Sequence, residues 1–547
     1  MDITFAGYTF TFWILTIKNR YEPENFQITQ TEGGIVAKAD SLSFGGGAGI
    51  TPGLVQITFS NHPNGFSWQV DTEHTDLIKG VRVRIRPLPL GTVIIPDGGE
   101  LNLKEGDPGK VFVYPGGYYP LRHLSSTGVE PYAGPLPTWA AQFAIVRTDN
   151  QSLFLSAREY PPRVKKIWVY KKGLNQEIYL YSEANASQRS TKYVAPTWTL
   201  ETVKDWRSAV MDYSQWMAEA FQIKAFNERS NVKSWFKEIN LMVIFHGISH
   251  LGSIGHDFRT MAARLEDLSH LHPPSQTLVK VAGFEGNIDR EWPDVDPATI
   301  LGGEEGFRHL INTGHRLGYH IIPHLNVWGA SYENPKTQKF LPYQIYDQEG
   351  HPSTWSFDFD QDEIAEEVFA YISPDVPEWR QDMKEKIHKL VDMGVDGIYL
   401  DQTGTFINDL HHDHYRGLRA LYAELGTTFP EIQFTGEAPI NELTASLVSV
   451  TCGIAILPSP QLAEMYQLLF GPYIRSYGYN LPPEPYAGVW GGPFEWERWS
   501  EDRYRSYVER SGWVNGIPSL NLTDKRIRLD SKLVELVLDE AKKYRMC

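Results

Sequence analysis

Short runs in which apolar and polar residues alternate fill the first part of the chain. Gly80–Ile85 reads GVRVRI, Ala144–Val146 forms another apolar run, and turn clusters such as Asp97–Gly99 separate runs of this kind. Alternation with a period of two, interrupted by glycine-rich turns, is typical of half-buried strands. We therefore expect residues 1–200 to form an all-β domain, a sandwich of two packed antiparallel sheets.

The spacing of the apolar residues changes after this region. They now recur at intervals of three or four, at Trp206, Val210, Tyr213, Met217 and Phe221. This spacing places them on one face of an α-helix. We expect this helix to lie in a connecting region, residues 201–234.

From about residue 235, short apolar runs alternate with helical stretches. The clear runs are Leu241–Phe245, Leu278–Val281, Tyr319–Pro323, Gly397–Leu400 and Ile432–Thr435, and the looser ones are Gly453–Leu457, Ala487–Trp490 and Ile517–Leu520. Strands separated by helices predict parallel β-α units, and eight units in roughly 310 residues fit a (β/α)8 barrel with insertions. The predicted fold is multidomain, with an N-terminal β-sandwich followed by a (β/α)8 TIM barrel over residues 235–547.

One helix before the fourth of these strands has a clear beginning and end. Asp375 and Glu378 have the spacing of a capping box, Pro377 suits a first helical turn, and Gly394 suits a C-terminal cap. We expect a helix between Asp375 and Gly394, followed closely by a strand that ends in an aspartate.

Two carboxylates end neighbouring strands of the predicted barrel. In the fourth strand Ile398 and Leu400 alternate with Tyr399 and Asp401, and Glu437 ends the fifth strand in the same way. If the apolar residues face the surrounding helices, both acids lie at the C-terminal mouth, where barrel active sites are found. The alternative interpretation is that each acid is an ordinary strand-end or capping group.

The distance between these acids indicates a reaction class. Asp401 and Glu437 are 36 positions apart with one predicted helix, Tyr415–Leu425, between them, and adjacent strands lie about 4.8 Å apart. Two carboxyl groups on such strands can approach the roughly 5 to 5.5 Å separation of retaining glycosidases, rather than the roughly 6.5 to 9.5 Å of inverting ones. In a retaining mechanism one carboxylate attacks the anomeric carbon, and the other has a raised pKa and transfers the protons.

The same part of the chain resembles a known group of enzymes. The motifs are Pro377-Glu378-Trp379, Gly394 through Gln402, His411–His414 and Thr435-Gly436-Glu437, preceded by Asp205-Trp206-Arg207 with Tyr213 and Trp216. Over about residues 200–545 they resemble the barrel of α-glycoside hydrolases, nearest the endo-α-N-acetylgalactosaminidase family and related uncharacterised glycosidase-like proteins. The N-terminal part is similar to their β-supersandwich in general character.

This resemblance implies a glycoside hydrolase that acts on an α-linked sugar by double displacement, with Asp401 as nucleophile and Glu437 as acid/base. The pair is similar, more remotely, to that of the α-amylase superfamily. The sequence differs from the α-amylase pattern at two places. Tyr399 occupies the place of the usual arginine, and His324-Leu325-Asn326 replaces an Asp-then-Asn-His pattern. An α-amylase proper is therefore not expected.

Further polar and aromatic residues near the strand ends are candidates for binding sugar hydroxyls or stacking on a pyranose ring. They are Glu285 after the second strand, with Asp289 nearby, His324, Asn326 and Trp328 after the third, Tyr399 and Gln402 beside Asp401, His412 and His414 in the following loop, and Trp490 after the seventh. The alternative for His324 and Trp328 is ordinary packing.

Composition and charge exclude several partners. Asp+Glu total 67 against 51 Lys+Arg, a net charge of -16, which would repel a phosphate backbone in the absence of a basic stripe. No run approaches the roughly 18 apolar residues of a membrane helix. We expect a carbohydrate substrate, either an oligosaccharide or a glycoconjugate, with no nucleic acid and no membrane, and the oligomeric state stays open.

Metal and cofactor motifs are also missing from the sequence. The two cysteines, Cys452 and Cys547, exclude a disulfide framework and thiolate-rich zinc sites. His246 and His250 lack the glutamate of an H-E-x-x-H helix, the cluster His411–His414 has no second well-spaced set of ligands, and no P-loop, Rossmann or G-x-S-x-G motif is present. We expect no cofactor and no metal.

The compartment and two other functions stay open. Tyr8–Ile17 lacks the basic n-region and cleavage site of a signal peptide, so we expect a first strand there, and the cytoplasm is favoured. The protein could instead be a catalytically inactive carbohydrate-binding protein, or a metal-dependent hydrolase that uses the mouth histidines. The presence of both strand-end carboxylates favours the glycosidase over the binding protein, which needs neither.

Overall fold

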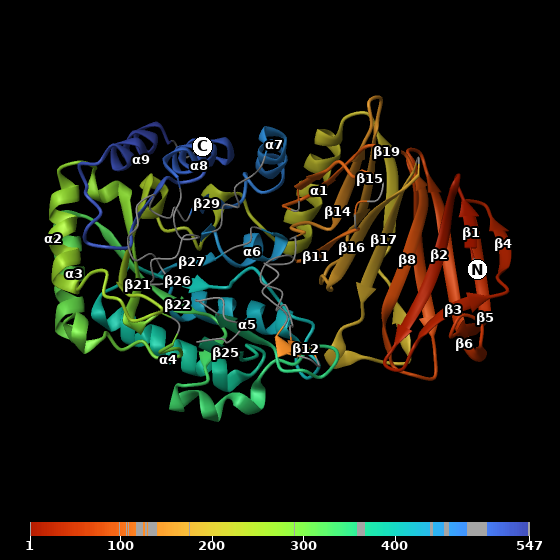
Figure 1. Ribbon diagram of the computed structural model, residues 1–547, viewed down its shortest axis with the longest axis horizontal. Helices are drawn as coiled ribbons and strands as arrows, with labels where there is room; N and C mark the ends of the chain where they lie inside the picture. The colour runs from red at the N-terminus through yellow and green to blue at the C-terminus, as the bar shows by residue number, and fades with distance from the viewer. Residues whose placement is uncertain are drawn as a thin grey trace.

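The computed structural model describes residues 2–544, except 98, 105–106, 108, 116–123, 126–127, 130–138, 174, 289, 358–366, 438–440, 453–458 and 479–499. Two bodies form the molecule (Figure 1): long antiparallel strands from the N-terminal part of the chain, and a barrel with surrounding helices from the rest. This arrangement agrees with the predicted β-sandwich followed by an α/β barrel.

The N-terminal body consists of two antiparallel layers. In spatial order, one layer contains β11 (Lys110–Tyr114), β16 (Lys165–Lys172), β17 (Asn175–Glu183), β8 (Ile78–Leu88), β2 (Tyr8–Thr16) and β1 (Asp2–Phe5). The other contains β10 (Gly99–Leu101), β9 (Thr92–Ile95), β14 (Phe143–Arg147), β15 (Ser152–Ala157), β19 (Trp198–Val203), β7 (Gly65–Glu73), β6 (Gly49–His62), β5 (Gly34–Phe44) and β4 (Gln27–Thr31). β3 (Arg20–Glu24) pairs with a strand of each layer, β18 (Lys192–Val194) pairs with β7, and β12 (Leu124–Ser125) pairs with β13 (Gly128–Val129).

The alternating pattern of these strands builds the core between the layers. Val81, Val83 and Ile85 of β8 are buried in the same apolar cluster as Ile57 and Phe59 of β6. The arginines between the β8 valines are on the opposite face of the strand, as a period of two requires. The antiparallel sheet domain predicted from the alternation is therefore confirmed.

A helix leads from the sheets to the barrel. α1 (Trp206–Phe221) begins after Asp205, whose side chain accepts a hydrogen bond from the Arg207 N–H at 3.1 Å. The short helices η2 (Phe226–Glu228) and η3 (Trp235–Glu238) follow it. The helix predicted from the spacing of the apolar residues is confirmed, and its buried face packs in the large core of the barrel side.

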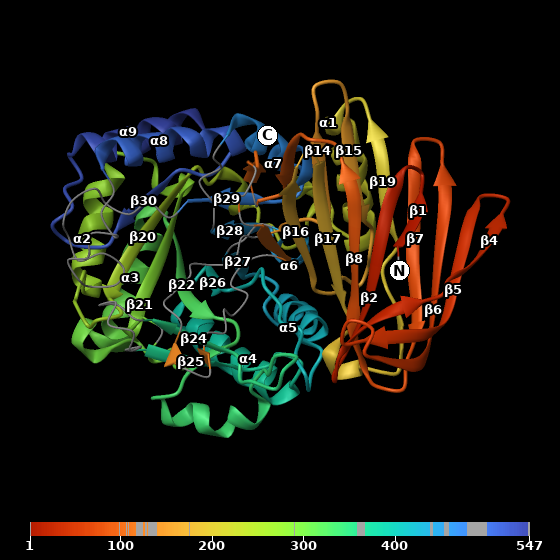
Figure 2. The same cartoon turned by 45° about the vertical axis from the view of Figure 1, so that its right-hand side comes forward.

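Within the described residues, eight parallel strands form a nearly closed barrel (Figure 2). In spatial order they are β30 (Ser519–Leu522), β20 (Leu241–Ile248), β21 (Thr277–Asn287), β22 (His320–Asn326), β26 (Gly397–Asp401), β27 (Gln433–Glu437), β28 (Val450–Cys452) and β29 (Arg475–Tyr477). A single parallel bridge between Tyr477 and Ile517 links the two ends of this sheet.

Helices and a small sheet surround the barrel. The helices are α2 (Phe258–Ser269), α3 (Gly303–Leu317), α4 (Pro377–Met393), α5 (His414–Thr428), α6 (Glu442–Leu447), α7 (Pro460–Leu469), α8 (Glu501–Ser511) and α9 (Lys532–Lys543). The short helices are η1 (Ala186–Gln188), η4 (Pro274–Gln276), η5 (Thr299–Leu301), η6 (Pro335–Lys339), η7 (Leu341–Tyr343) and η9 (Gly512–Val514), and the small sheet contains β23 (Gly329–Ser331), β25 (Glu367–Tyr371) and β24 (Thr354–Phe357). Over the part of the chain that the structure describes, no helix has both the length and the apolar character needed to cross a membrane.

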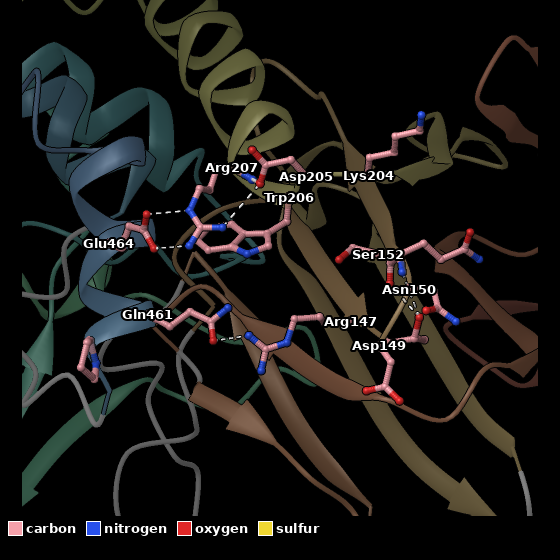
Figure 3. Close-up of a pocket in the computed structure, with 13 residues that line it drawn as sticks. Arg147, Asp149, Asn150, Ser152, Lys204, Asp205, Trp206, Arg207, Gln461 and Glu464 are labelled. Atoms are coloured by element: carbon pink, nitrogen blue, oxygen red, sulfur yellow. Dashed lines mark hydrogen bonds and ion pairs between the residues drawn. The ribbon is translucent and has the colours of Figure 1, made fainter.

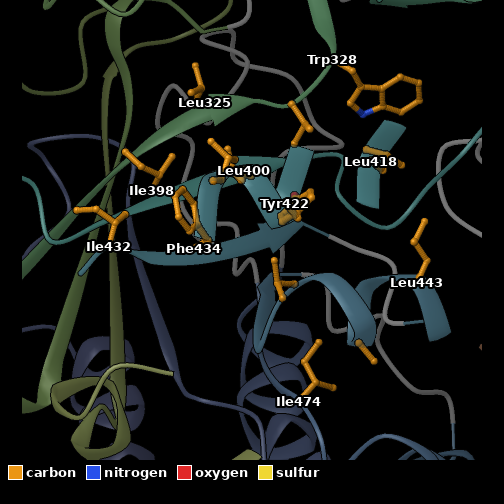
Figure 4. Close-up of a cluster of buried hydrophobic side chains, with 14 of the residues drawn as sticks. Leu325, Trp328, Ile398, Leu400, Leu418, Tyr422, Ile432, Phe434, Leu443 and Ile474 are labelled. Atoms are coloured by element: carbon orange, nitrogen blue, oxygen red, sulfur yellow. The ribbon is translucent and has the colours of Figure 1, made fainter. Parts of the chain in front are cut away.

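The two faces of the fourth and fifth barrel strands differ as the sequence predicts. Ile398 and Leu400 of β26 and Phe434 of β27 pack in the core shared with the surrounding helices (Figure 4). Tyr399 belongs instead to a separate cluster with Ile322 and other barrel-strand residues. The polar ends of both strands are thereby directed into the barrel rather than toward the helices.

Several predicted strand positions need correction. β22 continues through Pro323 to Asn326, because the strand pairs with β21 up to Pro323 and with β26 from His324 onward. The runs predicted at 453–457 and 487–490 lie outside the described residues, and β28 and β29 occupy the sixth and seventh places in the barrel. These two strands escaped prediction because each has only three residues and contains polar ones.

The predicted capping box of α4 is wrong. The helix begins at Pro377, and the residue before it, Val376, makes no side-chain cap. Asp375 is held elsewhere, because its carboxylate accepts hydrogen bonds from the Arg416 guanidinium at 2.6 and 2.9 Å and from the backbone N–H of Asp413 at 3.1 Å. The predicted C-terminal cap is confirmed, because Gly394 adopts a left-handed φ of 101°.

Candidate active site

Asp401 and Glu437 meet at the mouth of the barrel. The register of β26 and β27 places Tyr399 beside Thr435 and Leu400 beside Gly436, so the next residues along the two strands are the two acids. Asp401 is buried, and Glu437 retains partial exposure. Two carboxyl groups from adjacent strands therefore share one site.

The environment distinguishes the two acids. Burial raises the pKa of Glu437 well above its usual value, and the negative charge of Asp401 and a hydrogen bond with it raise this pKa further. The positive charge of Lys280 opposes this shift in part. Glu437 is thus the member of the pair that keeps its proton as the pH rises.

Asn326 orients Asp401. Its side-chain N–H group donates to Asp401 Oδ2 at 3.1 Å and to Gln402 Oε1 at 3.1 Å. The amide oxygen of Asn326 is itself fixed, because it accepts from the backbone N–H groups of Trp328, at 2.9 Å, and Gly329. Asn326 therefore holds the carboxylate of Asp401 in one orientation.

Gln402 links the two acids through its backbone. Its φ of 55° lies in the left-handed region, which is uncommon for a residue with a side chain. In this conformation its N–H donates to Glu437 Oε2 at 3.3 Å, and its side chain donates to the hydroxyl of Tyr371 at 3.1 Å. Gln402, which directly follows Asp401 in the chain, thus contacts Glu437, the acid that keeps its proton.

A buried cation lies beneath the acids. The Lys280 Nζ is 3.3 Å from the centre of the Tyr399 ring, and that ring meets His324 edge-on at 4.8 Å. His324 Nε2 is 3.8 Å from Asp401 Oδ1. Burial, and then the charge of Lys280, lower the pKa of His324 well below its usual value, so its imidazole is neutral. His324 thus presents an uncharged ring nitrogen beside Asp401.

Glu285 provides a third buried carboxyl near the mouth. The Trp292 indole N–H donates to Glu285 Oε1 at 3.0 Å, and the Trp292 ring packs against His324 at 5.4 Å. The other oxygen, Oε2, has no hydrogen-bond partner among the residues that the structure describes. Burial raises the pKa of Glu285 to about 8, so this side chain is protonated at neutral pH and can donate a hydrogen bond.

The structure places the remaining sequence candidates in different surroundings. Trp328 is completely buried between Tyr371, at 4.2 Å, and His414, at 4.4 Å, and its indole N–H donates to the Gln402 carbonyl at 3.1 Å. This position corresponds to the packing alternative, in which the ring supports Gln402 and leaves no open face for a sugar.

The histidines of the following loop are also held by protein groups. His414 is buried, and its Nδ1 accepts from the backbone N–H of Ile407 at 3.0 Å. His412 is half-buried, and its Nδ1 lies 2.8 Å from Asp409 Oδ2. The two candidates Trp490 and Asp289 lie outside the described residues. The structure therefore brings Glu285, His324, Asn326, Tyr399 and Gln402 around the two acids.

Two polar residues inside the barrel, Lys280 and Asn521, were not identified from the sequence. Asn521 is buried on β30 beside Ile244, and neither its amide oxygen nor its amide nitrogen has a partner in the described part of the chain. The hydroxyl of Thr435 is likewise buried without one. A polar residue at an inward position of an apolar strand, as in LVKV or SLNL, was the signal that could have found them.

Two crevices lie outside the barrel mouth. One, of about 490 Å³, lies between α1, α7 and the β14–β15 turn (Figure 3), and there Glu464 pairs with Arg207 at 2.7 Å. The other, of about 570 Å³, separates the sheet domain from the loop that contains His412. Across the described ranges, no group of three or more histidine, cysteine or carboxylate side chains is arranged to hold a metal ion.

Comparison with known proteins agrees with this architecture. A family model described as a domain of unknown function, DUF6259, matches residues 195–424, and no curated protein sequence matches the chain. The α-N-acetylgalactosaminidase NagBb from Bifidobacterium bifidum, in complex with GalNAc, superposes with a TM-score of 0.69 at 11% identity, covering 100% of this chain and 93% of that one.

Two α-galactosidases are more distant structural relatives. The GH36 α-galactosidase AgaA from Geobacillus stearothermophilus has a TM-score of 0.51 at 9% identity, covering 97% of this chain and 75% of that one. The galactosidase domain of the α-galactosidase-sucrose kinase AgaSK has a TM-score of 0.54 at 11% identity, with coverages of 97% and 73%. At these identities the comparison demonstrates a fold shared with α-glycosidases.

Proposed function

We propose that this protein is a retaining glycoside hydrolase that acts on an α-linked sugar, with Asp401 as nucleophile and Glu437 as acid/base. The observation that carries this proposal is the pair of carboxyls on adjacent strands, one of which keeps its proton. Carboxyls that end adjacent strands, which lie about 4.8 Å apart, can approach the roughly 5 to 5.5 Å separation of retaining enzymes, whereas an inverting enzyme needs roughly 6.5 Å or more to admit a water molecule.

In the first step the protonated Glu437 gives its proton to the glycosidic oxygen as the bond to the anomeric carbon breaks. Asp401 attacks that carbon from the opposite face and forms a glycosyl ester, while the aglycone leaves as an alcohol. The Asn326 side chain, which donates to Asp401 Oδ2, leaves Oδ1 to act as the attacking atom.

In the second step Glu437, now a carboxylate, takes a proton from water. The resulting hydroxide attacks the anomeric carbon, the ester bond to Asp401 breaks, and the sugar leaves with its original configuration. Loss of the ester restores the negative charge of Asp401, which again raises the pKa of Glu437. The starting protonation states therefore return at the end of each cycle.

Polar groups inside the barrel are suited to bind the sugar. His324 Nε2, Glu285 Oε2, Thr435 Oγ1 and the Asn521 amide are buried without hydrogen-bond partners in the described part of the chain, and such groups gain free energy when ligand hydroxyls pair with them. The names of the structural relatives suggest galactose and N-acetylgalactosamine as the first sugars to test. We propose residues 235–547 as the catalytic barrel, with the sandwich at 1–200 and the connecting region at 201–234.

The test is hydrolysis of nitrophenyl α- and β-glycosides of galactose, N-acetylgalactosamine and glucose, with Asp401→Ala as the matched variant. We expect turnover of one α-glycoside, loss of that turnover in the variant, and the α-anomer as the first product in a proton NMR time course. A β-anomer first product would contradict the retaining mechanism. Sugar binding without turnover of any glycoside or oligosaccharide would favour the carbohydrate-binding protein.

A further inference from the structure

A buried glutamate lies five residues after Glu437, at the junction of the two bodies. Glu442 is the first residue of α6 and is completely buried. Its Oε2 accepts hydrogen bonds from the Tyr114 hydroxyl at 2.5 Å and the Gln142 side chain at 3.0 Å, and its Oε1 accepts from the Tyr213 hydroxyl and, at 3.4 Å, the Gln142 backbone N–H. Groups from β11, from the residue preceding β14 and from α1 thus converge on this barrel-side carboxylate.

Asn441, the residue before it, holds three segments together. Its side-chain nitrogen donates to the Gly404 carbonyl at 2.5 Å and to the Pro115 carbonyl at 2.5 Å, and its Oδ1 accepts from the Thr444 N–H at 2.8 Å. Gly404 follows Asp401 by three residues, and Pro115 directly follows β11. A single amide, four residues after Glu437 in the chain, therefore joins the segment after Asp401 to the sheet domain.

The loop after Asp401 has a second attachment to the sheets. Asn408 donates to Glu183 Oε2 at 2.9 Å and to the Ala184 carbonyl at 2.8 Å, and it accepts from the Ala186 N–H at 2.7 Å. All of these partners lie on or directly after β17. The loop is therefore fixed to the sheet domain through Asn408 as well as through Asn441.

Two cationic side chains of the sheet domain lie near the tyrosines that bind Glu442. Lys165 of β16 is buried, lies 5.2 Å from the centre of the Tyr114 ring and pairs with Glu159 at 2.5 Å. Arg158 lies 5.9 Å from the centre of the Tyr213 ring. Within the part of the chain that the structure describes, the donors to Glu442 come from the sheet domain and α1. Both oxygens of Glu442 are satisfied, which favours a rigid junction.

We propose that Asn441 and Glu442 are positioning residues through which the N-terminal sheet domain fixes the relative placement of Asp401 and Glu437. The inference rests on the proposed function, because placement matters only if the two acids act together. The sheet domain then helps to set the geometry of the catalytic centre, although none of its residues that donate to Glu442 takes part in the reaction. A displacement of about 1 Å in such a site can reduce turnover by about 100-fold.

The first measurement does not depend on activity. Hydrogen exchange followed by mass spectrometry is compared between the unmodified full chain and the variants Tyr114→Phe and Glu442→Gln. We expect exchange to become about tenfold faster at residues 401–408 and 441–447, because loss of one donor or of the charged acceptor loosens the junction. Tyr114→Phe removes one donor and leaves the carboxyl of Glu442 in place, so it is the variant to measure if Glu442→Gln does not fold.

The matched control is Glu464→Gln. It breaks another contact between α1 and the barrel side, the ion pair with Arg207 at 2.7 and 2.9 Å, but touches neither segment that follows the acids. We expect exchange at 401–408 to stay unchanged in this variant. Equal exchange in Tyr114→Phe and the unmodified chain would overturn the proposal, as would equal acceleration in the control.

The second measurement uses the glycoside identified by the substrate panel. In Tyr114→Phe we expect kcat to fall by about 10- to 100-fold with a smaller change in KM, and the basic limb of the pH profile to move to lower pH, because Glu437 moves away from the charge of Asp401. A lower amount of folded protein alone would leave this limb in place, and an unmoved limb would contradict the positioning role. If no glycoside is hydrolysed by the unmodified chain, the proposed function fails, and the exchange measurement still decides whether the junction fixes residues 401–408.

Discussion

Two glutamates, five residues apart in the chain, illustrate how the barrel mouth and the domain junction differ. Burial raises the pKa of both Glu437 and Glu442. At the junction, hydrogen bonds from Tyr114, Tyr213 and Gln142 lower the pKa of Glu442 in part. At the mouth, the charge of Asp401 raises the pKa of Glu437 further.

The difference teaches that burial by itself does not identify a reactive acid. Glu442 has no exposed surface, and each of its oxygens has two donors, so no substrate can reach it and its role is to hold segments together. Glu437 keeps partial exposure and a like-charged neighbour. A raised pKa indicates proton transfer only where a reacting group can approach the acid.

The largest effect is expected from a change at the barrel mouth, where Glu437 is the acid in this comparison. Glu437→Gln removes the transferable proton, so we expect hydrolysis of a natural glycoside, which has a poor leaving group, to fall by about 100- to 10,000-fold. A nitrophenyl glycoside of the same sugar needs less protonation, and its first step should fall less. Burst kinetics measure this step, and an equal loss for both substrates would contradict the acid role of Glu437.

The next effect concerns the cation below the acids. Turnover should fall as the pH rises through the pKa of Glu437, because only the protonated form is the acid. Lys280 lowers that pKa, so in Lys280→Met we expect the basic limb of the pH profile of kcat/KM to move to higher pH. A limb that does not move would show that Lys280 does not act on Glu437.

A third effect tests a buried carboxyl that has only one side-chain donor. The pKa of Glu285 is raised to about 8 in the folded protein, above an unfolded value of about 4.3. The protonated Glu285 therefore contributes its full stability below the unfolded pKa. This contribution to the free energy of unfolding is lost as the pH rises through about 8, at up to about 1.4 kcal/mol per pH unit. We expect Glu285→Gln to flatten the fall of Tm between pH 5 and pH 8, and thermal unfolding across this range checks it.

The smallest effect on stability is expected for an exposed carboxylate. Glu464 pairs with Arg207 at the surface, and both side chains are more than 40% exposed. Glu464→Gln should change the free energy of unfolding by less than about 0.5 kcal/mol, since exposed ion pairs contribute little. Denaturant unfolding measures this, and a larger loss would show that the α1–α7 contact supports the junction more than its geometry indicates.

Local patterns account for what the sequence could predict. The alternation in Ile398–Asp401 correctly indicated which side chains face the helices, and the spacing from Trp206 to Phe221 indicated α1, because each pattern repeats within a few residues. The same reasoning brought Asp401 and Glu437 to adjacent strand ends. Their assignment as nucleophile and acid/base stays a proposal.

The rest depends on contacts between distant parts of the chain. Glu442 meets Tyr114 across 328 positions, and nothing in its local sequence distinguishes it from a first-turn helix acid. Asp375 has the spacing of a cap, yet Arg416 binds it. Three-residue strands such as β28 carry too few residues for a period to appear, so pairing with their neighbours, rather than their own sequence, makes them strands.

The left-handed backbone of Gln402 implies a trade-off between stability and activity. A glycine would adopt this conformation at a cost lower by roughly 1 kcal/mol, yet it would lose the side-chain contacts with Asn326 and Tyr371. An engineer who seeks a more heat-resistant form would therefore find Gln402→Gly attractive for the backbone and harmful to the alignment of Asp401. The position marks where this chain accepts a less stable fold in exchange for an ordered site.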